Sequence, residues 1–429
     1  MSVRAIHAMN RFGLGRRGDE APPGDPAAWL AAQLEGPDPA LALPARTLAE
    51  GLVAWRDDLR RGNDGISAAR GILREDTATL LDHAATTAAP FRERLVWFWA
   101  NHFTVSIRRG GVAAVANAYL REAIRPHVTG RFADMLGAVM RHPAMLYYLD
   151  NAQSIGPDSV AARASGRGGL NENLARECLE LHTVTPAAGY GQADVTALAR
   201  LLTGWSVALR QDPPRALFRP RAHAPGAKVV MGQTYPQGPA ALDAVLGWLA
   251  RHPATLHNLA GKLVRHFVAD DPPAAAVARV AAVLRESDGD LKAAALAVTR
   301  LDEAWVPLAK LRSPAEYVLA VVRAMDLAPG SRPQLRGAMA ALGQAVMNAP
   351  LPNGWPDTAA DWASPEAMMR RIDWAYGVAG RGGGLDAMAV GARALGPLLG
   401  AATRDAMARA GSRRDALALL FTAPEFQRR

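Results

Sequence analysis

The spacing of the apolar residues constrains the fold most, because they recur every three or four positions along most of the 429-residue chain. This period puts apolar side chains on one face of an α-helix, whereas a half-buried strand needs strict alternation. Alanine, leucine and arginine, which favour helices, are abundant. The pattern predicts helices over residues 91–103, 112–125, 132–141, 173–182, 193–202, 240–251, 256–268, 274–286, 290–300, 314–325, 333–343 and 364–378.

Alternation typical of strands is nearly absent. Its best example is the segment AKVVMG at 227–232, which we expect to form a short hairpin with the region around Phe218. Half of the residues are hydrophobic and 21% are charged, which is typical of a globular chain. The sequence therefore predicts an all-α, multi-helical globular body with long loops and at most a short β-hairpin.

Three long segments rich in helix-breaking residues divide the helices, at 151–173, 209–228 and 348–365. Loops of this length are uncommon in compact domains and often carry function. The first two flank the helix expected at 173–182. We therefore expect a main helical domain at 1–300 that carries the site, and a C-terminal helical subdomain at 301–429 packed on it.

The charge of the chain, its longest apolar runs, its first residues and its cysteine content each argue against a class of protein or site. The net charge is +9, but only four of the 49 basic residues are lysines, and the arginines are scattered among acids, which argues against a nucleic-acid partner. No apolar run is long enough for a membrane span. The first residues lack the pattern of a signal peptide, so we expect a cytoplasmic protein. The single cysteine, Cys178, rules out an intrachain disulfide and multi-cysteine metal sites.

The segment GLNENLARECLELHTVTPAAGY, at 169–190, is unusually rich in acids and amides. On a regular helix Asn173, Glu177 and Glu180 fall within one narrow arc, and Arg176 lies beside it. Glu177 and Glu180 are three positions apart and repel each other. If they are partly buried, they need an arginine, a shared proton or a metal ion as compensation.

Three interpretations of this segment stay open. Arg176 is four positions from both Glu172 and Glu180, so the acids could belong to a structural Glu–Arg network. They could instead form a catalytic pair in which Glu177, Glu180, Arg176 and Asn173 act on a substrate. They could also ligate a divalent metal together with histidines from neighbouring helices, for which His102 and His182 are the candidates.

Other polar residues lie where the long loops begin or end. Asp150 and Asn151 close a helix just before the first loop, and His223 and Lys228 lie on a turn-rich segment in the second. We expect these four residues to contribute to substrate binding if the loops fold back on the helix at 173–182. Sequence motifs of P-loop proteins, of serine hydrolases with a nucleophile elbow and of HExxH zinc enzymes are all absent.

Several long motifs resemble, in the same order, those of the bacterial family called domain of unknown function 1800. They include NRFGLG near the start, ERLVWFWANHFTVS, NENLARECLELHTVTPAAGYGQADVTALARLLTGW and NAPLPNGWPDTAADW. The resemblance covers nearly the whole chain. Two positions depart from the family pattern: Ala224 stands where aspartate is usual, and Thr185 stands where glycine is usual.

The resemblance implies a largely α-helical protein whose activity the family name leaves open. Relatives often carry export signals and are often encoded beside a secreted sulfatase- or phosphatase-like protein. Two hypotheses follow. The chain is an enzyme, metal-assisted or not, of the hydrolase or oxidoreductase class, using the carboxylate, arginine and histidine cluster. Alternatively, it is a non-catalytic scaffold or maturation partner of that neighbouring protein.

Overall fold

A computed structural model describes residues 2–62, 67–166 and 168–429. The described residues form 23 α-helices connected by loops and short 3₁₀ turns, which confirms the predicted all-α class. The helices of the first half are α1 (Val3–Arg11), α2 (Pro26–Ala32), α3 (Leu48–Arg61), α4 (Ala68–Thr86), α5 (Pro90–His102), α6 (Val112–Tyr119), α7 (Phe132–Arg141), α8 (Pro143–Tyr148), α9 (Val160–Ser165), α10 (Asn173–Glu177) and α11 (Gln192–Leu202). The helices of the second half are α12 (Ala240–Arg251), α13 (Pro253–Phe267), α14 (Ala274–Glu286), α15 (Leu291–Thr299), α16 (Pro314–Met325), α17 (Leu335–Ala341), α18 (Ala359–Trp362), α19 (Pro365–Ala379), α20 (Ala387–Ala394), α21 (Ala401–Ala408), α22 (Arg413–Thr422) and α23 (Pro424–Gln427).

Four short strands form two antiparallel hairpins in the described part of the chain: β1 (Trp205–Ala208) with β2 (Arg215–Phe218), and β3 (Lys228–Val230) with β4 (Gln233–Tyr235). The expected pairing of 227–232 with the region around Phe218 was wrong, since Phe218 pairs with Trp205. The reason is local. Met231 and Gly232 both have positive φ, 47° and 77°, which makes a two-residue turn that folds β3 directly onto the next strand.

Two of the expected helices change their winding partway. The helix expected at 112–125 is α6 followed by a π-helical turn, η2 (Leu120–Ile124), and the one at 173–182 is α10 followed by a second π-helical turn, η5 (Cys178–His182). A π-helical turn inserts an extra residue into the helix and is often found at functional sites. Sequence period alone does not reveal it.

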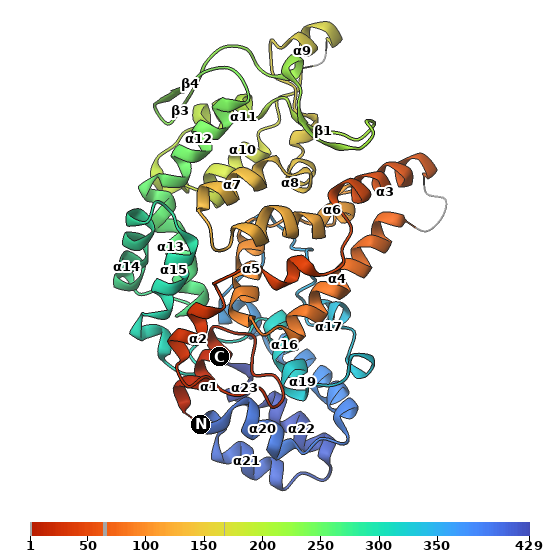
Figure 1. The fold of residues 1–429 in the computed structure, drawn as a ribbon, viewed down its shortest axis with the longest axis vertical. Helices are drawn as coiled ribbons and strands as arrows, with labels where there is room; N and C mark the ends of the chain where they lie inside the picture. The colour runs from red at the N-terminus through yellow and green to blue at the C-terminus, as the bar shows by residue number, and fades with distance from the viewer. Residues whose placement is uncertain (1, 63–66, 167) are drawn as a thin grey trace.

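Figure 1 shows an elongated molecule with both hairpins at one end, α20–α22 at the other and α5 between them. Two clusters of buried apolar side chains fill it. The larger draws on residues from Phe12 to Ala304, and the smaller on residues 315–426 together with Leu14 and α4 residues such as Leu81. The N-terminal part of the chain thus packs into both clusters, and the division at residue 300 stays a prediction. In the described ranges no helix is both long and apolar enough to span a membrane.

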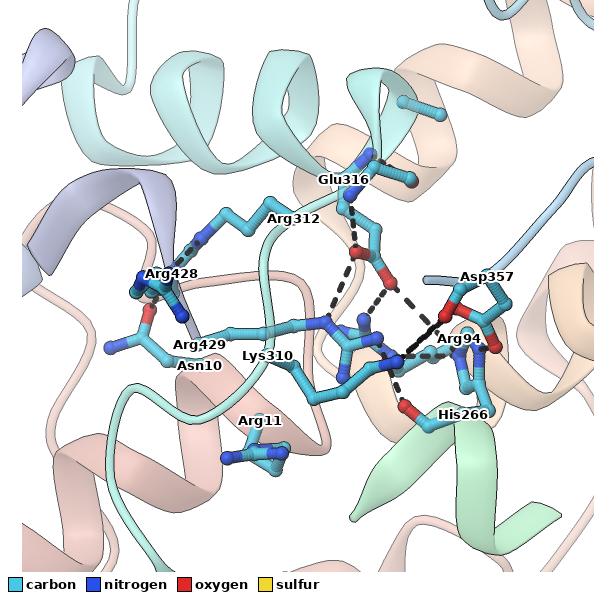
Figure 2. A network of polar contacts seen from close by, with 12 residues as sticks. Asn10, Arg11, Arg94, His266, Lys310, Arg312, Glu316, Asp357, Arg428 and Arg429 are labelled. Carbon is cyan, nitrogen blue, oxygen red and sulfur yellow. Dashed lines mark hydrogen bonds and ion pairs between the residues drawn. The ribbon is translucent and has the colours of Figure 1, made fainter. Parts of the chain in front are cut away.

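Buried charges join the helices of the two clusters (Figure 2). Arg94 of α5 forms an ion pair with Glu316 at the start of α16, and Arg429 Nε donates to the same carboxylate over 3.1 Å. Burial by itself raises the pKa of Glu316, but the charges of Arg429 and Arg94 outweigh it and hold that pKa far below its usual value. Glu316 is therefore ionised in the folded protein.

His266 of α13 completes this network without a free ring nitrogen. Its Nδ1 is 2.7 Å from Asp357 Oδ2, and its Nε2 accepts from Arg94 Nε over 3.3 Å. Lys310 forms an ion pair with Asp270 and donates to Asp357 O over 2.7 Å. Because both nitrogens of His266 are engaged, its imidazole ring has no lone pair available to act as a base. We therefore interpret the network as structural.

Candidate functional site

The segment from residue 171 to 185 starts as a short helix and widens into the π-helical turn η5. Asn171 Oδ1 accepts from the backbone N–H of Asn173 over 2.9 Å, and α10 begins at that residue. Most of its apolar side chains turn inward, and its acids, Arg176 and Asn173 remain on the outer side. The buried residues of the segment are Leu174, Ala175, Cys178, Leu179, His182, Thr183 and Val184.

Arg176 is held on the N-terminal side of the acids. Its NH2 group is 3.2 Å from Glu172 Oε2 and 3.0 Å from Gln192 Oε1. Glu172 also accepts from Thr196 Oγ1 over 2.7 Å. Of the two ion pairs that the spacing allows, the one with Glu172 therefore forms, and the one between Arg176 and Glu180 does not. Glu172 and Gln192 together keep the guanidinium group away from the acid pair.

Glu177 and Glu180 are partly exposed, and neither has a hydrogen bond or ion pair to any residue that the structure describes. Burial raises the pKa of Glu177, and the charge of Glu180 raises it further, against the lowering effect of Arg176. A structural Glu–Arg network would pair these acids with arginines. Instead Glu177 is an unpaired carboxyl group with a raised pKa, as in catalytic acid–base residues.

Two tyrosines lie near enough to these acids to respond to their charge. Burial raises the pKa of Tyr148, at the end of α8, and Glu177 adds to the rise. Burial likewise raises the pKa of Tyr190, and Glu180 adds to that rise. Both phenols therefore stay protonated and can donate hydrogen bonds at neutral pH. We call Glu177, Glu180, Tyr148 and Tyr190 the acid patch.

Asp150 lies in the turn that follows α8, two residues after Tyr148. It has the left-handed conformation, with φ 58°, and its Oδ2 is 3.2 Å from Arg109 NH2. The positive charges of Arg109 and Arg108 partly offset the rise in the pKa of Tyr148, so these two arginines also lie near the acid patch. Asn173 is exposed on the outer side of α10.

Thr185, just beyond η5, has a backbone conformation that β-branched residues rarely adopt. Its φ of 63° and ψ of 163° lie in a region that is nearly exclusive to glycine. Its N–H donates to Leu179 O over 2.8 Å, which holds the strained turn against the helix. Strained residues of this kind gather at functional sites, and Asp150 is a second one beside the acid patch.

Replacing Thr185 with glycine is expected to raise the free energy of unfolding by about 1 kcal/mol. Strain of this kind costs about 1–3 kcal/mol, and glycine gives back part of it as chain entropy. Urea unfolding followed by circular dichroism measures the change. As a control, Thr403→Gly within α21 is expected to lose about 0.5 kcal/mol. A loss at Thr185 as large as at Thr403 would show that the turn is not strained.

Asn151 is fully buried, and its amide holds two backbone carbonyls. Nδ2 donates to Leu202 O over 3.2 Å and to Trp205 O over 3.1 Å. These bonds tie the end of α8 to the start of β1. With no exposed surface, this side chain faces protein rather than a solute, although it was expected to bind substrate.

His223 and Lys228 meet inside the second long loop. His223 Nδ1 is 2.8 Å from Thr203 O, and its Nε2 is 3.4 Å from Lys228 Nζ. Lys228 also donates to Ala224 O over 2.5 Å, and burial lowers its pKa to about 8. Both side chains are buried; His223 ties the loop to the end of α11, and Lys228 ties it to its own backbone. The structure brings these two together, but it shows no contact from them to the acids.

His102 and His182 also come together, with ring centroids 5.8 Å apart. His102 Nε2 is 3.2 Å from His182 O and therefore carries the proton, while Nδ1 accepts from Lys262 Nζ over 3.2 Å. Lys262 also donates to Leu181 O over 2.9 Å, and Asn258 Nδ2 donates to Thr183 O over 3.0 Å. These side chains satisfy the carbonyl groups that the end of the π-helical turn leaves free.

This arrangement does not favour a metal ion at His102 and His182. Both nitrogens of His102 are engaged, and its neighbour is a cationic ammonium group rather than a carboxylate. Burial lowers the pKa of His182 to about 3, so its ring is neutral, but neither of its nitrogens has a carboxylate or other polar partner within hydrogen-bond distance among the described residues. Across residues 2–62, 67–166 and 168–429, no group of three or more histidine, cysteine, aspartate or glutamate side chains is placed to hold a metal ion. The divalent metal considered from sequence therefore has no support in the donor geometry.

A family model described as "Protein of unknown function (DUF1800)" matches residues 7–428. The chain belongs to this family. The resemblance of its motifs to this family is thus confirmed over nearly the full length. No curated protein and no solved structure matches the chain.

Three residues that the structure places beside the acids or the π-helical turn of this DUF1800 protein were not among those expected from its sequence: Tyr148, Tyr190 and Lys262. Tyr190 lies within one of the family motifs, but an isolated tyrosine gives no signal until its neighbours in space are known. Lys262 lies 80 residues from the π-helical turn that it caps. One signal was available, because only four lysines occur among 49 basic residues.

Cys178 is expected to be unreactive in the folded DUF1800 protein. Burial raises its pKa to about 12, and the thiolate is the reactive form. With Ellman's reagent at pH 8 we expect labelling only as fast as the protein unfolds, and labelling of one thiol in urea. Rapid labelling without denaturant would show that the π-helical turn η5, which contains Cys178, opens locally.

Proposed function

We propose that this DUF1800 protein is a hydrolase in which Glu177 is the general acid–base residue and Glu180 is the second carboxylate. The observation that carries the proposal is the state of Glu177, which is partly exposed, unpaired and raised in pKa by burial and by Glu180. A catalytic carboxylic acid needs a pKa shifted toward the working pH, and two neighbouring carboxylates in unequal environments are a common way to obtain it.

In the proposed reaction the two acids have different roles. Protonated Glu177 donates its proton to the oxygen of the leaving group, and Glu180 accepts a proton from the attacking water. Tyr148 and Tyr190 donate hydrogen bonds to the substrate. Asn173, exposed on the same side of α10, adds an amide that both donates and accepts.

Glycosides are the first substrate class to test. Their hydrolysis commonly uses two carboxyl groups, one protonated with a raised pKa and one ionised, and aromatic side chains beside them. Carboxylic esters and phosphate esters follow, since each also needs a protonated leaving-group oxygen. Screening 4-methylumbelliferyl derivatives of these three classes between pH 4 and pH 8 tests the proposal.

The dependence of the hydrolysis rate on pH is part of the test. If Glu177 is the acid, the rate falls as pH rises through its pKa, because the ionised form has no proton to donate. Its raised pKa places this decline above about 4.3, the usual value for glutamate. Absence of turnover with every class, or a rate that rises across this range in the manner of a simple hydroxide reaction, would overturn the proposal.

The remaining hypotheses have less support. Metal-assisted chemistry would need a donor group that the described residues do not supply, so no step here passes through a metal. The scaffold hypothesis expects the acids to be buried and paired, but Glu177 and Glu180 are partly exposed and unpaired. A partner protein encoded nearby and a cytoplasmic location stay predictions.

A further inference from the structure

A cavity of about 310 Å³ lies among α4, α5, α13, α16 and the loop that precedes α18. This volume is at the lower end of the range for small-molecule sites. Most of its wall is apolar, and the acid patch does not contribute to it. The apolar side chains of the wall include Leu80, Leu81, Val96, Phe98 and Leu319.

The acidic groups on the wall are already neutralised by partners. Glu93 accepts from Arg125 NH2 over 2.7 Å, and the network of Figure 2 supplies the partners of the other two. These two are Glu316, paired with Arg94, and Asp357, paired with His266.

Two basic groups on the same wall have no carboxylate partner among the residues that the structure describes. They are Lys262 and Arg265, three positions apart on α13 and therefore neighbours on its surface. Lys262 is largely buried, and the contacts of its ammonium group are both neutral: Leu181 O and His102 Nδ1. Arg265 is exposed and makes only a long bond to Asp270 O, at 3.4 Å.

Lys262 can bind one more group. An ammonium group has three N–H donors, and two are used. Burial lowers the pKa of Lys262 to about 8, and the charge of Arg265 adds to that lowering, so the cation still predominates at pH 7. A largely buried cation without a counter-ion is costly, and an anion that reaches it recovers part of that cost.

We propose that this cavity binds a small amphiphilic anion, with its apolar body among these side chains and a carboxylate or phosphate head on Lys262 and Arg265. The site is separate from the acid patch. Lys262 links them only through its bond to Leu181 O, within the π-helical turn that follows Glu177.

Calorimetric titration of the full chain at pH 7 tests this proposal with four octyl probes. Octanoate and octyl phosphate carry the two candidate heads, octanamide is neutral, and octylamine is cationic. We expect one or both anions to bind, and the amide and the amine to bind at least tenfold more weakly. No binding of either anion at millimolar concentration, or equal binding of the amide, would overturn the proposal.

Substitutions test whether anion binding depends on the charge of Lys262 as well as on the apolar cavity. Lys262→Met is expected to weaken anion binding at least tenfold, and Lys292→Met, which removes an outer lysine paired with Glu35, is expected to leave it unchanged. Glu177→Gln is also expected to bind the anion normally, so failure here and failure of the proposed hydrolase are distinguishable. Undiminished binding by Lys262→Met would contradict the assignment.

Because Lys262 also caps a helix, a second measurement uses the unaltered protein. With N-hydroxysuccinimide acetate and mass spectrometry, the four lysines can be followed one by one. Octanoate is expected to slow the acetylation of Lys262 and to leave that of Lys292 unchanged. If octanoate binds but Lys262 is acetylated at the same rate, the head does not lie on this lysine and the proposal fails.

Discussion

Glu316→Gln is expected to lower the free energy of unfolding by about 3–5 kcal/mol, the usual cost of removing one partner of a buried ion pair. Its carboxylate is shared by Arg94 and Arg429, and both of these side chains are buried. Glutamine keeps the size of the side chain but leaves two guanidinium groups without a counter-charge. Urea unfolding at pH 7 gives the value.

Glu50→Gln is the matched control for this change. Glu50 and Glu316 both occupy the third position of a helix and complete a capping box, with Thr47 and Ser313 respectively. Glu50 is exposed and has no buried arginine partner, so we expect a loss of about 0.5–1 kcal/mol from the cap alone. Similar losses for the two variants would show that the network of Figure 2 adds no stability.

The stability that Glu316 contributes to the fold is expected to fall at low pH. The pKa of Glu316 is lower in the folded protein than in the unfolded chain, despite the burial that raises it, because Arg429 and Arg94 favour its charged form. Its contribution to stability is therefore fully present above the unfolded value, about 4.3, and is lost as pH falls below it. The difference in stability between wild type and Glu316→Gln should shrink between pH 5 and pH 3.

Glu177→Gln is expected to reduce turnover by about 10²- to 10⁴-fold, the usual contribution of a general acid–base residue. Its stability should be unchanged or slightly higher. Burial and Glu180 raise the pKa of Glu177 in the folded state, so ionising it at pH 7 costs free energy that glutamine does not incur. Loss of activity together with retained stability is the pattern that separates a catalytic acid from a structural one.

Glu366→Gln serves as the control for turnover. Its side chain is exposed near the start of α19, and among the described residues it forms an ion pair only with Arg370, four positions along the helix. We expect wild-type rates from this variant on the substrate found in the screen. Wild-type rates from Glu177→Gln would overturn its assignment, and a lower melting temperature in Glu177→Gln than in Glu366→Gln would favour the structural network.

Helices were predictable because the determinant is local. The apolar period acts within a few positions, and α5, α12 and α16 lie within one or two residues of their expected bounds. The hairpin pairing failed for a related reason. The turn at Met231–Gly232 sets which strands meet, and a methionine with positive φ does not stand out in a sequence.

The site was predictable only in part. A cluster of acids on one side of 173–182 follows from helical spacing, and Glu172 and Arg176 do pair four positions apart. Arg176 does not pair with Glu180, because Gln192 of α11 contacts the Arg176 guanidinium group instead. Helical spacing does not reveal this contact. Tyr148 and Tyr190 join the acids from two other segments, so only packing brings them there.

The sequence by itself determined the helical class, the family and the position of the acids within 173–182, since the helical period and the family motifs each depend on residues close together in the chain. The tertiary structure decided which charges are compensated. Arg94 meets Glu316 across 222 positions, while Glu177 and Lys262 form no ion pair with any described residue. Charged side chains interact through space, so whether each one is neutralised or left available depends on the packing of distant helices.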